Sequence, residues 1–255
     1  MPSNTWTPDA LSSEARRLAG TGWRLVEAQH KVSTLKLVDT LDEQDVLERL
    51  IEGTKPPVPE ACRDLHYLLS TPFRYDPPYP TGSRFRRAGR TPGVFYAAEA
   101  VTTAVAELAF YRLLFFAESP DTPWPVNPAE YTAFSVAYAT EYGLDLTAPP
   151  LDEDAPAWTN PTEYSPCQDV ADAARAAGLE VIRYASVRDP AHGASLALLT
   201  CAVFQGKAPI AFQTWRIYLR NTGAQALCEF PPQRVEFSGS AFAADPRIAG
   251  MRWDR

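Results

Sequence analysis

One carboxylate stands in the most apolar stretch of the sequence. Between residues 101 and 116 only Glu107 and Arg112 are charged, and the apolar residues recur at helical spacing. Positions five apart on a helix point about 140° away from each other, so Arg112 is not a helical partner for Glu107. A carboxylate in this setting must pair with a distant cation, face a cavity or carry a raised pKa. Two alternatives follow for Glu107: a structural ion pair with an arginine elsewhere, or a functional carboxylate in a cleft.

Positive charge is concentrated in residues 74–90, although the whole chain has a net charge of −7. The segment is rich in glycine and proline, and its five arginines and one acid give a local charge of +4. The arginines are Arg74, Arg84, Arg86, Arg87 and Arg90, the acid is Asp76, and the aromatic residues between them are Tyr75, Tyr79 and Phe85. Guanidinium groups suit phosphate and aromatic rings can stack on a base, which favours an anion-binding loop. A solvated loop is the equal alternative, because 20 of the 24 basic residues are arginine.

A third candidate lies where a predicted strand ends, at residues 184–188. Ser186 and Arg188 stand just before an Asp-Pro-Ala-His-Gly turn, and strand ends beside such turns often carry ligand contacts. Ser186 lacks a recognisable triad partner, so a nucleophilic role is disfavoured. We expect its hydroxyl to bond a ligand or to cap the turn.

The elements that must position these residues are of mixed type. Capping residues and periodicity predict helices over about 7–20, 40–53, 99–117 and 165–178, where residues 40–43 form a capping box. Composition predicts strands at 23–28, 94–97, 131–138, 181–184, 196–204, 212–219, 226–230 and 234–237. Loops are expected at 55–59, 71–93, 119–128 and 148–166. Without strict βαβ alternation or a clean linker, the pattern indicates a single α+β domain.

Composition and absent motifs exclude several classes of protein. The 255 residues are 45% hydrophobic and 22% charged, as in soluble globular proteins, with no apolar run long enough to span a membrane. The N-terminus lacks a signal-peptide pattern, so we expect a cytoplasmic protein. The negative net charge argues against direct nucleic-acid binding. Dinucleotide, P-loop, zincin and α/β-hydrolase motifs are all missing.

Cysteine and histidine are scarce and scattered. Cys62, Cys167, Cys201 and Cys228 lie far apart, and we expect them to be free thiols that pack as small hydrophobic residues. His30, His66 and His192 stand at no metal-ligand spacing, so no metal is expected.

Five segments together resemble the RES-domain family, which is named for an arginine, a glutamate and a serine. The segments span roughly residues 22–205 and are Gly22-Trp-Arg-Leu-Val-Glu-Ala-Gln29, Gly82-Ser-Arg-Phe-Arg86, Pro92-Gly-Val-Phe-Tyr-Ala-Ala98, Thr103-Ala-Val-Ala-Glu107 and Gly178-Leu-Glu-Val-Ile-Arg-Tyr-Ala-Ser-Val-Arg188. The resemblance implies a fold similar to ADP-ribosyltransferases of the diphtheria-toxin type, with central β-sheets flanked by helices.

The same resemblance implies an activity and a partner. Family members are toxins of bacterial toxin–antitoxin pairs that break the nicotinamide–ribose bond of NAD⁺, which is a substrate rather than a cofactor. They deplete NAD⁺ by transfer of ADP-ribose to water or phosphate, or they modify a protein. The expected partner is a cognate antitoxin of the Xre, helix-turn-helix type, and a homodimer within the complex is one expected assembly. The implied domains are a helical extension (1–21), an NAD-binding catalytic domain (22–240) and a C-terminal tail (241–255).

The resemblance also assigns residues. It makes Glu107, Arg24 and Ser186 catalytic and gives NAD⁺ binding to Arg84, Arg86, Tyr96 and Arg188. Many compact members carry Arg-Trp-Asn at the glycine-rich turn, so Arg84 and Arg86 compete for the role of its arginine here. Where those members have a tyrosine near the first arginine, this chain has Gln29 and Ser33, and that position stays unassigned.

The chemistry fits this assignment. Cleavage of NAD⁺ passes through an oxocarbenium-like state, which a fixed carboxylate stabilises. Nicotinamide is already a cationic leaving group, so no acid is needed to protonate it. Two alternatives remain: a protein-modifying ADP-ribosyltransferase, and a non-catalytic module that binds a nucleotide or phosphate.

Overall fold

The computed structural model describes residues 6–27, 34, 37–75 and 82–254. Its described strands form one mixed sheet in the order β1-β2-β5-β4-β3-β6-β7-β8, with β1 pairing also with β3. The strands are β1 (Arg16–Glu27), β2 (Phe95–Ala98), β3 (Ala129–Asp145), β4 (Val181–Ala185), β5 (Ala194–Leu198), β6 (Ala211–Arg220), β7 (Gly223–Cys228) and β8 (Gln233–Ser238). Among the strands that the structure describes, only β3 and β4 pair in parallel.

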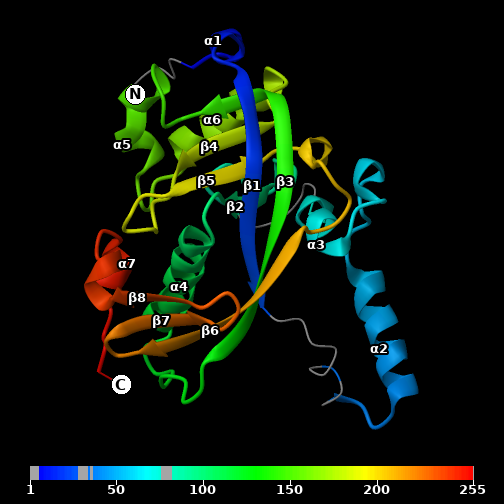
Figure 1. Ribbon diagram of the computed structural model, residues 1–255, viewed down its shortest axis with the longest axis vertical. Coiled ribbons are helices and arrows are strands. Elements are labelled where there is room, and N and C mark those ends of the chain that lie inside the picture. The colour runs from blue at the N-terminus through cyan, green and yellow to red at the C-terminus, as the bar shows by residue number, and fades with distance from the viewer. Residues whose placement is uncertain (1–5, 28–33, 35–36, 76–81, 255) are drawn as a thin grey trace.

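The long strands β1 and β3 join two halves of the sheet (Figure 1). They pair antiparallel along their length, with Trp23 opposite Ser135, while β1 meets β2 only at Trp23 and Ala98. One half contains β2, β5 and β4, and the other contains β6, β7 and β8. Strands β1, β2 and β4 contribute side chains to the site described below, together with the helix of residues 101–118.

Both halves of the sheet pack against helices. The described helices are α1 (Pro8–Ser13), α2 (Leu41–Thr54), α3 (Tyr67–Ser70), α4 (Val101–Glu118), α5 (Ala155–Trp158), α6 (Ser165–Ala176) and α7 (Pro246–Ala249). Short 3₁₀ turns occur at η2 (Glu60–Cys62), η3 (Thr71–Arg74), η4 (Leu151–Asp154), η5 (Cys201–Val203) and η6 (Gly239–Phe242). Helix α4 packs with β6–β8 in one core cluster, and α6 packs with β4 and β5 in another.

The observed fold confirms the mixed α+β class. Helix α2 begins with the expected capping box at Thr40 and Glu43, and α4 and α6 lie where the pattern predicts helices. The N-terminal helix is shorter than predicted, since it ends at Ser13 and residues 16–27 form β1 instead. Pairing with β3 over the whole of β1 outweighs the local helical pattern. The predicted loop at 148–166 also contains two helical turns, η4 and α5.

The C-terminal residues are packed against the domain. Phe242, Ile248 and Met251 are buried in the cluster that contains α4. The division into an extension, a catalytic domain and a tail stays a prediction. Residues 28–33 and 76–81 lie outside the described residues, and with them His30, Gln29, Ser33, Asp76 and Tyr79.

The prediction of four free thiols is wrong for two of the cysteines. Cys62 and Cys201 form a disulfide between η2 and η5, with their Cα atoms 6.2 Å apart. The two residues are 139 positions apart in the sequence but belong to the same buried cluster, so only the folded chain brings them together. Cys167 and Cys228 are free and buried, as expected. Among the described helices, none is both long and apolar enough to cross a membrane.

Candidate functional site

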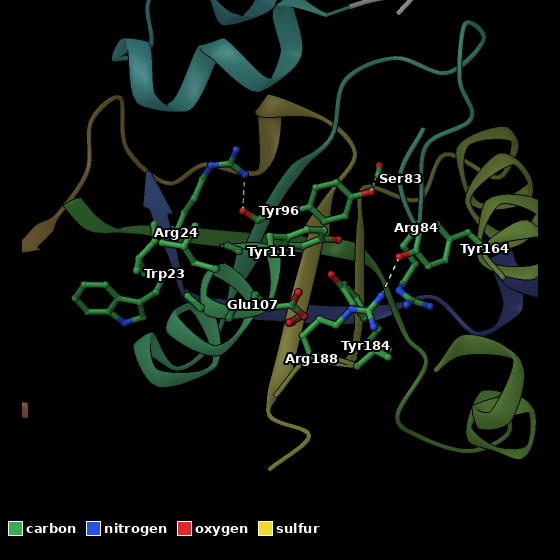
Figure 2. Close-up of a pocket in the computed structure, with 17 residues that line it drawn as sticks. Trp23, Arg24, Ser83, Arg84, Tyr96, Glu107, Tyr111, Tyr164, Tyr184 and Arg188 are labelled. Atoms are coloured by element: carbon green, nitrogen blue, oxygen red, sulfur yellow. Dashed lines mark hydrogen bonds between the residues drawn. The ribbon is translucent and has the colours of Figure 1, made fainter. Parts of the chain in front are cut away.

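A pocket of about 300 Å³ brings most of the predicted site residues together (Figure 2). Its lining includes Arg24 from β1, Arg84 from the turn before β2, Tyr96 from β2, Glu107 from α4, and Arg188 from the loop after β4. Ser186 and Arg86 do not reach the lining. The lining therefore contains three arginines and one carboxylate, a net charge of +2 in a chain of net −7.

Glu107 projects from the middle of α4 into this pocket. Ten of the eighteen residues of α4 are buried, so the carboxylate sits on a helix that lies mostly in the core, although Tyr111 and Phe115 of the same helix are exposed. Its Oε1 accepts a hydrogen bond of 2.5 Å from the Ser186 hydroxyl. Burial raises the pKa of Glu107, while the Ser186 hydrogen bond and the charges of Arg188 and Arg84 oppose that rise. Of the two alternatives, the structure supports the carboxylate in a cleft.

Ser186 lies behind Glu107 rather than on the pocket surface. Its side chain has no exposed area, and its hydroxyl donates to Glu107 while accepting from the backbone N–H groups of Arg188 (3.3 Å) and Asp189 (3.0 Å). The ring of His192 contacts the Ser186 carbonyl oxygen, not its hydroxyl. Ser186 thus caps the turn, which is one of the two expected roles, and it also bonds Glu107; a bond from its hydroxyl to a ligand stays a prediction. A nucleophilic role has no support in this geometry.

A second hydrogen bond fastens the same loop to α4. Thr103, one helical turn before Glu107, donates to Asp189 Oδ2 at 2.7 Å. Gly193 closes the loop so tightly that a Cβ atom there would lie 2.2 Å from the Thr103 hydroxyl oxygen. Two contacts one turn apart therefore fix the loop of residues 186–193 against the helix that carries the carboxylate.

The two competing arginines have different surroundings. Arg84 lines the pocket, and it donates to the carbonyl oxygens of Trp158 (2.8 Å) and Asn160 (2.9 Å) beneath the ring of Tyr164. Arg86 points away and donates to the carbonyl oxygens of Thr91 and Tyr75. Arg84 is thus the arginine of this turn that reaches the pocket, whereas Arg86 holds the turn together.

Arg24 and Tyr96 meet on the other side of Glu107 (Figure 2). Arg24 donates from one terminal nitrogen to the backbone carbonyl of Tyr96 at 2.8 Å. Burial lowers the pKa of Arg24 to about 10, so it stays charged at neutral pH. The Tyr96 hydroxyl bonds Ser83 at 2.8 Å and accepts from the Phe85 N–H at 3.0 Å, which leaves its ring as the surface offered to a ligand.

Arg188 is held on every side of its guanidinium group. It donates to Asp245 Oδ2 at 2.8 Å, to the Tyr164 hydroxyl at 3.1 Å and to the Pro161 carbonyl, and it lies 3.9 Å from the Phe110 ring centre. Both members of its ion pair are buried, with 4% and 1% of their side chains exposed. Arg188 is therefore a fixed cation beside Glu107.

Several aromatic residues of the pocket are absent from the sequence prediction. Trp23, Tyr111, Tyr164 and Tyr184 line it together with Tyr96. Tyr111 follows Glu107 by four residues, so helical spacing was the available signal. Burial is the main cause that raises the pKa values of Tyr111 and Tyr184, and tyrosine phenols are neutral at neutral pH even without such a rise. The pocket thus offers neutral aromatic walls around one carboxylate and three cations.

The chemistry open to this arrangement is electrostatic. A buried carboxylate can stabilise a developing positive charge, arginines can bind an anionic group, and aromatic walls can hold a flat ring. Within the described part of the chain, no group of three His, Cys, Asp or Glu side chains is arranged to hold a metal ion.

Comparison with known proteins identifies the family of the chain. Residues 57–220 match the RES domain, and this range contains Arg84, Tyr96, Glu107, Ser186 and Arg188 but not Arg24. No curated protein matches the chain. A chain in the crystal structure of the M. tuberculosis MbcT–MbcA toxin–antitoxin complex is similar at 14% identity and a TM-score of 0.42, and the match covers 94% of this chain and 97% of that one. Because the RES-domain match spans more than half of its 255 residues, the chain belongs to the RES-domain family.

Proposed function

We propose that this chain is a NAD⁺-cleaving enzyme and the toxin component of a toxin–antitoxin system. The observation that carries the catalytic part is the position of Glu107: a carboxylate inside an aromatic-lined pocket, held by Ser186 and flanked by three arginines. NAD⁺ presents the complementary pattern, a cationic nicotinamide–ribose end and an anionic pyrophosphate. The toxin role rests on membership of the RES-domain family.

In the proposed reaction, Glu107 acts on the ribose. The C1′–N bond breaks with its electron pair passing to the nicotinamide nitrogen, so nicotinamide leaves as a neutral molecule. Positive charge then develops on C1′ and the ring oxygen, where a fixed carboxylate stabilises it. An acceptor oxygen, from water or phosphate, forms the new bond to C1′, and a water acceptor gives up its proton to solvent. Departure of a neutral molecule needs no general acid, and the pocket lining contains no histidine.

The three arginines have distinct proposed roles. Arg24 has a neutral carbonyl as its described partner, so its charge is available to a phosphate of the pyrophosphate. The charge of Arg84 is likewise directed at carbonyl groups and contributes a fixed positive potential. Arg188 is neutralised in part by Asp245 and serves chiefly to set the environment of Glu107.

The aromatic residues would hold the nicotinamide and exclude water. The pocket volume of about 300 Å³ lies at the small end of ligand sites, which suits one half of a dinucleotide better than the whole. We place the nicotinamide ribose beside Glu107, with the ring of Tyr96 available for stacking. The adenosine half would then extend beyond the pocket. A cognate antitoxin is proposed as the partner on the same family ground, and it would inhibit by covering the pocket.

Nicotinamide release by the purified, antitoxin-free protein tests this proposal. The protein is incubated with NAD⁺ with and without phosphate, beside a Glu107→Ala variant whose fold is checked by circular dichroism. We expect Glu107-dependent release, and product mass identifies ADP-ribose or its 1″-phosphate. NAD⁺ labelled in its adenosine half and added to lysate detects transfer to a protein instead. Intact NAD⁺ in all of these samples would overturn the enzymatic proposal.

A further inference from the structure

The C-terminal segment contributes a side chain to the surroundings of the site. Asp245 immediately precedes α7, and only 1% of its side chain is exposed. It lies 57 residues beyond Arg188 in the sequence and outside the range matched by the RES domain. A buried carboxylate needs partners, and Asp245 finds them in Arg188 and in the residues that begin α7.

Asp245 connects the helix α7 to the pocket. Its Oδ1 accepts from the Arg247 backbone N–H at 2.9 Å and from Arg247 Nε at 3.0 Å, which caps α7. Its Oδ2 accepts from Arg188 and from a terminal nitrogen of Arg247, each at 2.8 Å. Behind this carboxylate, Phe242 and Ile248 are buried in the cluster with α4, so Asp245 cannot move without disturbing the core.

The position of Arg188 depends on this carboxylate. The other contacts of its guanidinium are a carbonyl, a phenol and the Phe110 ring, all of them neutral. Asp245 is therefore the one described carboxylate that pairs with Arg188. Loss of the anionic member of a buried pair leaves an uncompensated cation, which would turn toward solvent. Arg188 would then leave its place beside Glu107.

We propose that Asp245 is a positioning residue, which holds the Arg188 guanidinium beside Glu107 and so makes the C-terminal segment part of the active site. The inference rests on the proposed function for its consequence in catalysis, but the geometry it asserts can be tested without a substrate. It predicts that the catalytic unit extends to residue 245 at least. A chain that ends near residue 220 would lack the anchor of Arg188.

The test variant is Asp245→Ser. Serine is a good helix cap, so it preserves the start of α7, but its side chain is too short to reach Arg188. Arg188→Gln serves as the reference, and the double variant closes a mutant cycle. Arg247→Gln is the matched control, because it removes another partner of Asp245 while both the Asp245 carboxylate and the Arg188 guanidinium are kept. Should Asp245→Ser fail to fold, Asp245→Asn keeps the cap and the shape, and the same measurements apply to it.

The first readout is the pH profile of kcat/KM for nicotinamide release. We expect a loss of about 10²-fold in Asp245→Ser, the cost of a misplaced site group. The acid limb of the kcat/KM profile of this variant should move to higher pH, because Arg188 no longer lowers the pKa of Glu107. The other charged or titratable neighbours of Glu107 are not substituted, and they are Arg84, Asp189, Tyr111 and Tyr184. Arg188→Gln should shift the limb in the same direction, and the double variant should be no worse than Arg188→Gln alone. An unshifted limb, or losses that multiply in the double variant, would overturn the proposal.

The second readout separates this inference from the reaction. The ¹³C signal of the Glu107 carboxyl is titrated by NMR in the same variants without NAD⁺. We expect its pKa to rise in Asp245→Ser and to stay at the wild-type value in Arg247→Gln. If the wild-type protein fails to cleave NAD⁺ but this rise occurs, the function is refuted and the positioning role stands. If Asp245→Ser leaves the titration of Glu107 unchanged, the positioning role is refuted whatever the reaction is.

Discussion

Removal of the buried Ser186 hydroxyl should leave the Glu107 carboxylate without its hydrogen-bond donor. The Ser186 hydroxyl donates to Glu107 at 2.5 Å and accepts from two backbone N–H groups, yet it exposes no surface to the pocket. Ser186→Ala removes this donor without substituting any residue that lines the pocket. Any effect on catalysis must therefore pass through Glu107 and the loop behind it.

The size of the effect follows from the kind of hydrogen bond that is lost. Hydrogen bonds to charged groups contribute about 1.5–3 kcal/mol, which converts to a fall in kcat/KM of roughly 10- to 150-fold. The direction of the pH effect follows from the same bond. Because the Ser186 hydrogen bond lowers the pKa of Glu107, its loss should move the acid limb of kcat/KM to higher pH.

The assay is initial-rate nicotinamide release from NAD⁺ between about pH 5 and 9, a range that brackets the ordinary and raised pKa values of a carboxyl group. Ser70→Ala is a matched control, since Ser70 is also a buried serine but lies in α3, away from the pocket. Wild-type kcat/KM with an unmoved acid limb in Ser186→Ala would refute the positioning role of this serine. A large loss of kcat/KM without a shift of the limb would indicate instead that Ser186 contacts the substrate.

Three further predictions concern stability and the arginines. Burial raises the pKa of Glu107, so between its ordinary and its raised pKa the folded state binds more protons than the unfolded state, and the stability of the protein falls as pH rises through that window. Glu107→Gln should therefore increase the Tm at pH 8 by roughly 2–4 °C for each kcal/mol of stability recovered. Calorimetry should show that this gain disappears below the ordinary pKa of a glutamate. Arg84→Lys should raise KM for NAD⁺, whereas Arg86→Lys should lower the Tm and spare KM, and equal effects on KM would contradict their separate positions. Cys62→Ser should lower the free energy of unfolding by up to about 5 kcal/mol, because the disulfide closes a loop of 139 residues. The activity of the folded protein should stay unchanged, and an unaltered denaturation midpoint would argue against the bond.

Glu107 could be recognised from the sequence because the apolar residues that surround it belong to the same short segment. Glu107 stands among apolar residues at helical spacing, and this contrast is visible without a structure. Helices with explicit caps, such as α2, were predicted well for the same reason, since Thr40 and Glu43 are only three residues apart. The assignments of Arg24, Arg84 and Ser186 came from the family resemblance rather than from spacing.

Features that depend on distant pairing left no local signal. Strand β1 looked helical up to about residue 20, and only its antiparallel partner β3 makes residues 16–27 extended. The disulfide joins cysteines 139 positions apart, and Asp245 meets Arg188 across 57 positions. The competition between Arg84 and Arg86 also needed the structure, because the directions in which the side chains of a turn point are not determined by composition.

The role of Glu107 is tested most directly by comparing NAD⁺ binding with NAD⁺ cleavage in Glu107→Gln. Glutamine keeps the shape of the side chain and an oxygen that accepts from Ser186, but it removes the negative charge that would stabilise the oxocarbenium-like state. With both proteins saturated with NAD⁺, as shown by rates that no longer rise with NAD⁺ concentration, we expect a similar half-saturating concentration and a loss of nicotinamide release of at least about 10²-fold. Release at the wild-type rate from the saturated variant would contradict the central claim that the Glu107 carboxylate drives the cleavage.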